Sequence, residues 1–268
     1  MIIEDFKKTV YQHYEEDGRK FPWRKKTSPW GIMVSEFMLQ QTQVERVIPY
    51  WIAWMEKRPD IRDTAQASLK DVLEQWSGLG YNRRAYYLKR SAEMIVRHYN
   101  GRVPGLPQNL LPLPGIGPYI AGAIACFAYN HPSVFIETNI RSAVIHFFFP
   151  GRYDVKDSEI KPILEESLER KNPRKWYYAL MDYGAAVKKI TENPGRRSAH
   201  YVRQSPFEGS LRQARGKILK TLISTSNCNL EELHLMTKIE IDKLYRVLII
   251  LKKEGLITEN GGLYRIVY

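Results

Sequence analysis

The 268-residue sequence contains only two cysteines, which is too few for a disulfide framework or for a cysteine-based metal site. Cys126 lies in an apolar stretch and Cys228 lies in a polar one, far away in the sequence. We therefore expect the protein to bind no metal through thiolates.

Long hydrophobic runs are also missing. A helix needs about 20 apolar residues to cross a bilayer, and the longest runs here are far shorter. The first residues, Met1 to Asp5, do not resemble a signal peptide. We expect an intracellular protein that makes no membrane contact.

Acidic residues are scarce relative to basic ones. The sequence has 41 Lys and Arg against 29 Asp and Glu, a formal net charge of +12 and a pI near 9.5. Such an excess indicates a polyanionic partner, although a basic composition can also serve solubility alone. At 44% hydrophobic and 26% charged residues, the chain is long enough for one large or two modest domains.

A glycine-rich turn at Leu113-Pro114-Gly115-Ile116-Gly117 precedes a helical stretch from Tyr119 to Ala128 that is rich in Ala and Ile. This pattern predicts a helix-hairpin-helix, although a plain interhelical turn would look similar. Glycines beside the first amides of a helix let a phosphate approach its positive end. We expect Gly115 and Gly117 to contact a nucleic-acid backbone.

Six motifs in a fixed order extend this pattern, and together they resemble the helix-hairpin-helix DNA glycosylase superfamily. The similarity is strongest to the A/G-mismatch adenine DNA glycosylases (MutY type), and endonuclease III is more distant. It covers roughly residues 5 to 187. The motifs are Pro22-Trp23-Arg24, Ser35 to Val44, Gly78 to Tyr81, Leu113 to Gly117, Glu137-Thr138-Asn139 and Met181 to Ala185.

The resemblance implies a mostly α-helical fold with two lobes and a cleft between them. Residues 1–206 would form the glycosylase body, in which 26–132 make the helical lobe with the hairpin and 1–25 with 133–206 make the second lobe. Residues 207–268 would form a separate module, whose three helical patterns and Asn-Gly hairpin predict a winged helix. Such modules either bind DNA or pair proteins.

Glu36 lies between apolar positions of a helical segment, where a carboxyl group usually has a partner or a catalytic role. An apolar pocket raises the pKa of a carboxyl group, which can then donate a proton near neutral pH. A solvated helix face is the ordinary alternative for an isolated Glu. The resemblance favours Glu36 as the catalytic acid, or as the group that positions water.

Glu137 follows an apolar, strand-like run from Ser133 to Ile136, and by resemblance its carboxylate stabilises the cationic sugar. The family has Asp followed by Gly where this chain has Glu137 and Thr138, so the longer side chain reaches further. A simple charge at the helix start is the alternative role. By the same resemblance we expect Asn139, at the beginning of the next helix, to be a catalytic residue as well.

Tyr119 occupies the position where endonuclease III has a lysine. That lysine forms a Schiff base with the sugar and leads to strand cleavage, which tyrosine cannot do. The resemblance therefore implies a monofunctional glycosylase, with Tyr119 close to the sugar.

The remaining site residues are also inferred from the resemblance. Trp23, Arg24 and Asp182 would surround the base pocket, although Trp23 could simply anchor a loop. Gln40, Gln41 and Thr42 interrupt two helices with polar groups that would enter the DNA minor groove. Gln41 would be the wedge, and Tyr81 would intercalate from the other side unless it only closes its turn. The basic helix face that follows carries Arg83, Arg84, Lys89 and Arg90. Such a face is usually just solvated, although this one adjoins the predicted groove.

The related glycosylases usually hold a 4Fe–4S cluster with four cysteines, and this chain has none between residues 187 and 227. We therefore expect no iron–sulfur cluster and no other cofactor. Residues 188–215 contain seven Lys or Arg and only two Glu. Arg196 and Arg197 in this segment would keep a DNA-backbone contact without the metal.

These observations predict a monomeric base-excision-repair enzyme that hydrolyses the N-glycosidic bond of a flipped base. Its partner would be double-stranded DNA with a mismatch or lesion. The protein would act inside the cell with the DNA, which means the cytoplasm or nucleoid if the source is prokaryotic. Adenine opposite guanine or 8-oxoguanine is the favoured target. Thymine or uracil opposite guanine is the alternative, and a non-catalytic DNA-binding regulator is a further alternative of another class.

Overall fold

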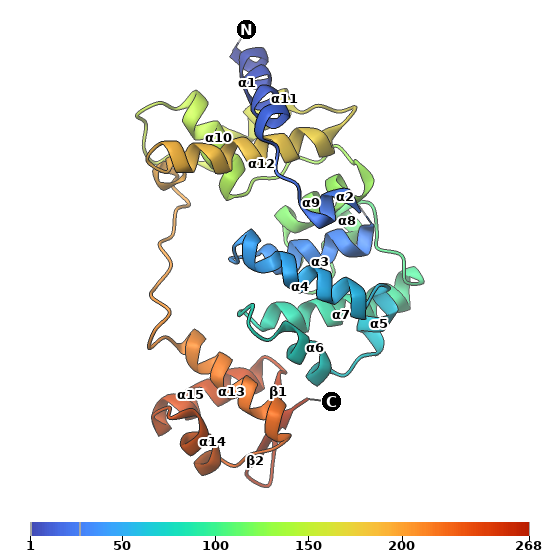
Figure 1. Ribbon diagram of the computed structural model, residues 1–268, viewed down its shortest axis with the longest axis vertical. Coiled ribbons are helices and arrows are strands. Elements are labelled where there is room, and N and C mark those ends of the chain that lie inside the picture. The colour runs from blue at the N-terminus through green and yellow to red at the C-terminus, as the bar shows by residue number, and fades with distance from the viewer. Residues whose placement is uncertain (1, 27, 268) are drawn as a thin grey trace. The chain divides into compact units, whose positions relative to one another are not determined.

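The computed structural model describes residues 2–26 and 28–267. Over these residues the chain forms fifteen α-helices, one short 3-10 helix and one antiparallel pair of strands. The expected mostly helical fold with a small C-terminal sheet is confirmed (Figure 1). The first nine helices are α1 (Ile2–Asp17), α2 (Pro22–Lys25), α3 (Pro29–Leu39), α4 (Val44–Lys57), α5 (Ile61–Gln66), α6 (Leu69–Trp76), α7 (Arg83–Tyr99), α8 (Pro107–Leu110) and α9 (Pro118–Tyr129). The remaining elements are α10 (Thr138–Phe148), α11 (Asp157–Ser167), α12 (Pro173–Ile190), η1 (Pro194–Arg197), α13 (Leu211–Thr225), α14 (Leu230–Thr237), α15 (Ile241–Lys253), β1 (Ile257–Asn260) and β2 (Leu263–Ile266).

The chain divides into two compact units. Unit 1 comprises residues 1–32, 104–112 and 116–203, and unit 2 comprises residues 33–103, 113–115 and 204–268. The C-terminal segment thus belongs to the same unit as helices α4 to α7. The domain and lobe boundaries expected from the sequence stay a prediction.

Unit 1 is built around α10 and α12, which lie against each other, with α1 packed on α12. Phe6, Ile140 and Trp176 are fully buried in its core, and the rings of Phe6 and Trp176 meet edge to face with centroids 5.8 Å apart. Gly184 makes this packing possible, since a Cβ there would lie 1.9 Å from the carbonyl oxygen of Asn139. Helix α12 is therefore fixed close to the start of α10.

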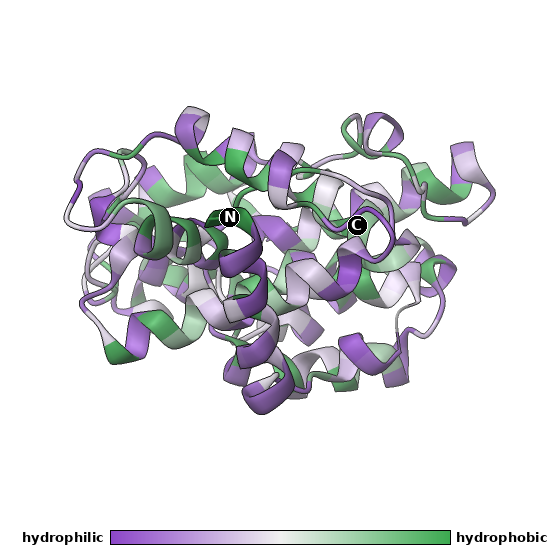
Figure 2. Ribbon diagram, turned by 90° about the horizontal axis from the view of Figure 1, so that it is seen from above, coloured by the Kyte–Doolittle hydropathy of each residue, from purple (hydrophilic) through white to green (hydrophobic). Residues whose placement is uncertain are grey.

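Unit 2 combines the bundle α4 to α7 with the C-terminal elements. Trp54 and Trp76 are fully buried, and their rings meet edge to face with centroids 5.8 Å apart. Helix α13 packs on α6, α14 and α15. Hydrophilic and hydrophobic residues alternate along the helices, as the purple and green of Figure 2 show.

The C-terminal segment forms the three helices and the hairpin that the sequence predicts. Strands β1 and β2 pair with Asn260 opposite Leu263, and the intervening Gly261 and Gly262 both have positive φ, at 57° and 77°. This backbone suits a two-residue hairpin turn. Cys228 also makes an antiparallel bridge with Tyr264. The identification as a winged helix stays a prediction.

The apolar, strand-like run from Ser133 to Ile136 forms no strand. The Phe135 amide donates instead to the hydroxyl of Tyr177, a residue 42 positions further along the chain, at 3.2 Å. A one-turn helix, α8, lies between α7 and α9. Among the described helices, none has both the length and the apolar character needed to span a bilayer.

Candidate active site and DNA-binding loops

The two hairpin glycines have different surroundings. Gly115 has φ +77°, and a Cβ there would lie 2.8 Å from the Tyr87 side chain and 3.1 Å from that of Phe37. Gly117 is the N-cap of α9, and a Cβ there would have no neighbour within 4 Å. Gly115 is therefore required by the protein's own backbone and packing. The space beside Gly117 leaves room for a phosphate at the N-terminus of α9, and this contact stays a prediction.

Glu36 lies in α3 and is only 4% exposed. Its helical neighbours Met33, Val34 and Phe37 are completely buried. The solvated-face interpretation of Glu36 is therefore wrong, because the helix has no exposed side at this point. A buried carboxyl group on a helix with apolar neighbours has the environment that suits a general acid.

The polar loop after α3 contains the predicted wedge. Gln41 is exposed and has φ +55°, and Tyr81 in the second loop has φ +49°. Left-handed backbone is unfavourable for residues other than glycine and is stable only where the surroundings fix it. Both predicted intercalating residues are therefore held in tightly specified turns.

Arg84 joins these two loops, and we did not expect its role. The residue is 6% exposed, so treating it as part of a solvated face is wrong. Its NH1 atom lies 2.6 to 3.0 Å from the carbonyl oxygens at the end of α3, and NH2 lies 3.0 Å from the Thr42 hydroxyl and the Gly80 carbonyl. Burial lowers the pKa of Arg84 to about 10. The guanidinium thereby cross-links the Gln40–Thr42 loop and the Gly78–Tyr81 loop.

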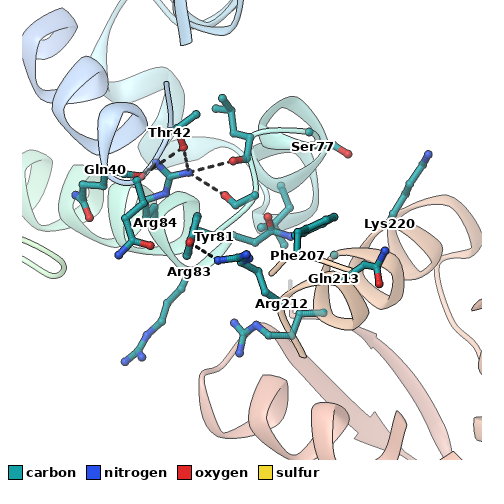
Figure 3. A pocket seen from close by; sticks show the side chains of 18 of the residues that line it. Gln40, Thr42, Ser77, Tyr81, Arg83, Arg84, Phe207, Arg212, Gln213 and Lys220 are labelled. Carbon is teal, nitrogen blue, oxygen red and sulfur yellow. Dashed lines mark hydrogen bonds between the residues drawn. The ribbon is translucent and has the colours of Figure 1, made fainter. Parts of the chain in front are cut away.

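The Tyr81 side chain contacts the C-terminal segment within unit 2. Arg212 of α13 donates from NH1 to the Tyr81 hydroxyl at 2.7 Å, and its guanidinium lies over the Tyr81 ring, 5.4 Å from the centroid (Figure 3). The Gln204 amide also donates to this hydroxyl. Tyr81 therefore does more than close its turn, because residues over 120 positions away determine its orientation.

Glu137 caps helix α10. One carboxylate oxygen accepts hydrogen bonds from the amides of Asn139 and Ile140 at 2.7 and 2.9 Å. The other accepts from the Asn139 side-chain amide at 3.2 Å. Asn139 in turn accepts from Lys188 Nζ at 2.9 Å, and burial lowers the pKa of Lys188. The helix-start role of Glu137 is therefore real, and it holds the carboxylate rigidly rather than excluding a catalytic role.

Tyr119 belongs to an aromatic cluster of unit 1. Its ring meets that of Phe135 at 5.9 Å, and Phe135 stacks on Tyr177 at 3.9 Å. Phe135 precedes Glu137 by two residues, so this cluster supports the segment that leads to the Glu137 carboxylate.

Arg24 lies over the ring of Tyr178, with its guanidinium carbon 4.4 Å from the ring centroid.

Asp182 is buried and pairs with two arginines. Its carboxylate accepts from Arg24 NH1 and NH2 at 2.7 and 2.8 Å, and from the amide and Nε of Arg19 at 2.8 and 2.6 Å. Burial alone would raise the pKa of Asp182, but the hydrogen bonds and charges of Arg24 and Arg19 lower it. Trp23 is 4% exposed and stacks on Phe21 at 5.2 Å. These residues organise the α1–α2 junction, and a contact with a base stays a prediction.

The basic segment after α12 places its two predicted DNA-binding arginines differently. Arg197 donates to the Phe149 carbonyl oxygen at 2.6 Å, just beyond the end of α10. Arg196 is exposed. Of the two, Arg196 is therefore the one available to a phosphate.

The predicted residues are distributed over both units. Unit 1 contains Trp23, Arg24, Gly117, Tyr119, Glu137, Asn139, Asp182, Arg196 and Arg197, and unit 2 contains Gln40, Gln41, Thr42, Tyr81 and Gly115, together with Glu36. Sequence reasoning missed Arg19, Arg84, Lys188 and Arg212. Only Arg84 had a usable signal, because it is in helical phase with Leu88, Ser91 and Ile95, all fully buried.

The cysteines do not fit an iron–sulfur cluster. Such a cluster takes four cysteine ligands, and the whole chain has two. Cys126 is buried in α9 of unit 1, whereas Cys228 is buried in unit 2. Within the described residues, no group of three or more His, Cys, Asp or Glu could hold a metal ion.

Comparison with known proteins gives consistent similarities. Residues 34–170 match the HhH-GPD superfamily of base excision DNA repair proteins. The chain is 37% identical over 232 residues to the adenine DNA glycosylase of Mycobacterium tuberculosis, a match that covers 78% of this chain and 75% of that protein.

Two solved structures share the fold. A thermostable thymine-DNA glycosylase has a TM-score of 0.62 and 24% identity, covering 69% of this chain and 86% of that one. A trapped endonuclease III–DNA covalent intermediate has a TM-score of 0.60 and 18% identity, covering 76% and 89%. At these identities the structures establish the fold alone.

Proposed function

Because the chain belongs to the HhH-GPD superfamily of base excision DNA repair proteins, alongside the adenine DNA glycosylases, we propose that it removes adenine mispaired with guanine or 8-oxoguanine. It is a DNA N-glycosylase, and DNA is its binding partner. The observation that supports adenine most strongly is the 37% identity to an adenine DNA glycosylase over 78% of the chain. The thymine-DNA glycosylase shares the fold at 24% identity and does not favour thymine as the substrate.

The proposed reaction is hydrolysis of the N-glycosidic bond of an extruded adenine. Departure of the base leaves a sugar with oxocarbenium character. An acid can assist this step by protonating the base, and a carboxylate can assist it by stabilising the positive sugar. Glu36, buried in the apolar helix α3, protonates the departing base. Glu137, held by three hydrogen bonds at the start of α10, stabilises the cationic sugar.

Strand cleavage is not part of the proposed reaction. Tyr119 lacks the amine that forms a Schiff base with the sugar, so the product is an intact strand with an abasic site. The Tyr119 ring packs on Phe135, and in this proposal it forms a wall of the sugar site rather than a nucleophile.

We also propose that the enzyme works without an iron–sulfur cluster. The segment after α12 is ordered by hydrogen bonds: Asn193 accepts from the Gly195 amide at 2.9 Å, and Arg197 donates to the Phe149 carbonyl oxygen. A parallel bridge between Val155 and Ser198 ties the same segment to the loop before α11. We further propose that the protein is a monomer and that it acts on DNA inside the cell.

The test is base release from end-labelled duplexes that contain A:8-oxoG, A:G, T:G, U:G or hypoxanthine pairs. Half of each sample is treated with alkali, which breaks the strand at an abasic site. We expect cleavage at adenine only after alkali. Release of thymine or uracil alone would contradict the adenine assignment, and cleavage without alkali would contradict the monofunctional mechanism. Tight binding without release from any duplex would favour a non-catalytic DNA-binding protein.

A further inference from the structure

A cavity of about 1260 Å³ lies within unit 2, between the two predicted DNA-contacting loops and helix α13 (Figure 3). Residues from Gln40 to Gln43 and from Ser77 to Arg84 line it from one side. The C-terminal segment lines it from the other. We call this cavity the α13 groove.

The charge of the α13 groove has one sign. Seven Lys or Arg line it, whereas the described lining residues include no Asp or Glu. Buried Arg84 donates to backbone carbonyl groups, and Arg215 pairs with Glu254 at 3.0 Å. Lys217 and Lys220 are exposed on α13 and make no ion pair within the described residues. One turn apart on the helix, they present two available positive charges on the same wall.

Polar contacts connect the C-terminal segment to the Gly78–Tyr81 loop and to helices α6 and α7. Besides the Arg212–Tyr81 hydrogen bond, Lys70 of α6 donates to the Ser226 hydroxyl at 3.1 Å. The NH1 atom of Arg83 in α7 lies 3.8 Å from a carboxylate oxygen of Glu254, the residue that follows α15. The groove therefore has two defined walls, one of which contains both predicted intercalating residues.

We propose that the α13 groove binds the sugar–phosphate backbone of DNA next to the extruded base, so that the C-terminal segment acts as a DNA-binding part of the enzyme. A lining of cations without carboxylates suits a phosphodiester chain, whose affinity comes mainly from charge. The groove adjoins Gln41 and Tyr81, so DNA that contacts these residues passes α13. The identity of the ligand rests on the proposed function.

Helix α15 is less suited to this role than α13. A winged helix usually reads DNA with its third helix. Here Ile241, Tyr245 and Ile249, spaced four residues apart on α15, are each 50% to 54% exposed. Arg246, Lys252 and Lys253 of α15 are exposed too, but the apolar stripe matches a phosphate backbone less well than the α13 wall does. The proposed DNA contact is therefore made by the first helix of the segment.

The test is a double substitution, Lys217→Gln with Lys220→Gln, in the full chain. The matched control is Lys8→Gln with Lys253→Gln, which removes the same charge from exposed positions of α1 and α15 outside the groove. Affinity for a duplex with an A:8-oxoG pair and for a fully paired duplex is measured by fluorescence anisotropy between 50 and 200 mM KCl. Circular dichroism melting checks that each variant is folded.

We expect the slope of log K against log salt to fall by roughly 2 for the groove variant, since each lost phosphate contact removes about 0.9. The loss should be similar for both duplexes, because backbone contacts do not depend on sequence. The control should keep the wild-type slope. An unchanged slope for the groove variant, or an equal fall for the control, would overturn the proposal.

Two further readouts separate the possible failures. Adenine release by wild-type protein is measured in parallel. If adenine is released but the groove variant keeps the wild-type salt slope, the groove proposal alone is refuted. If the groove variant has a reduced salt slope but wild-type protein releases no adenine, only the glycosylase assignment is refuted. Competition by poly-glutamate as strong as that by an oligonucleotide would show an acidic protein segment to be the ligand and would overturn the proposal.

Discussion

The guanidinium of Arg84 donates a hydrogen bond of 3.0 Å to the hydroxyl of Thr42, and this contact joins two loops that lie about 40 residues apart in the sequence. The same side chain also contacts backbone carbonyl groups of both loops. Lysine could not reproduce this geometry, because it has three donors on one atom instead of a planar fork. We expect Arg84→Lys to lower the free energy of unfolding by about 2–4 kcal/mol.

Urea denaturation would measure that loss, with Arg90→Lys on the exposed face of the same helix as the control. DNA affinity should fall in parallel, since both loops would lose their order. Equal stabilities for the two variants would show that the network around Arg84 is not energetically important.

The hairpin glycines give a matched pair of substitutions. Gly115→Ala places a methyl group 2.8 Å from Tyr87 in left-handed backbone, so we expect a loss of about 2–4 kcal/mol in stability. Gly117→Ala meets open space but puts alanine at the N-cap of α9, so we expect a smaller loss of about 1 kcal/mol. Its DNA affinity should nevertheless fall, because the methyl group lies where a phosphate approaches. Melting temperatures and binding titrations separate the two effects, and full DNA affinity in Gly117→Ala would refute the phosphate contact.

The sequence was sufficient to predict elements whose signals are local. The hairpin glycines, the apolar neighbours of Glu36 and the glycine turn of the C-terminal hairpin all lie within a few residues of the structure they specify. The contacts that orient the site are not local. Arg24 meets Asp182 across 158 positions, and Arg212 meets Tyr81 across 131, so no periodicity could indicate either pair. Arg84 is an intermediate case, because its helical phase predicted burial although its charge suggested exposure.

Asp182 should link stability to pH. Its pKa is below the ordinary value of 3.8, so the ion pairs with Arg24 and Arg19 stabilise the folded protein above about pH 4 and lose this effect as the pH falls through the folded-state pKa. Asp182→Asn leaves both arginines with an uncharged partner, and we expect a loss of about 3–5 kcal/mol at pH 7.

The difference between Asp182→Asn and wild type should shrink as the pH falls toward 2. Urea denaturation at several pH values would measure it, with Asp5→Asn on the exposed face of α1 as the control. A difference independent of pH would show that the charge of Asp182 contributes nothing.

Glu137 combines a structural and a proposed chemical role, and two substitutions can separate them. Glu137→Gln keeps a carbonyl oxygen that can accept from the Asn139 and Ile140 amides, so stability should fall by only about 1 kcal/mol. Without the charge, adenine release should slow by about 10²–10³-fold. Glu137→Asp keeps the charge on a shorter side chain and should keep most of the activity. If Glu137→Gln released adenine at the wild-type rate, Glu137 would be a helix cap only.

The central claim is that Glu36 acts as the acid of a monofunctional adenine glycosylase, and single-turnover release of adenine from an A:8-oxoG duplex tests it most directly. Wild-type protein and Glu36→Gln are compared at saturating enzyme, with Glu45→Gln on the exposed face of α4 as the control. We predict alkali-dependent strand breakage by wild type and control, and a rate about 10²–10⁴-fold lower for Glu36→Gln with unchanged DNA affinity. Adenine release by Glu36→Gln at the wild-type rate would contradict the account.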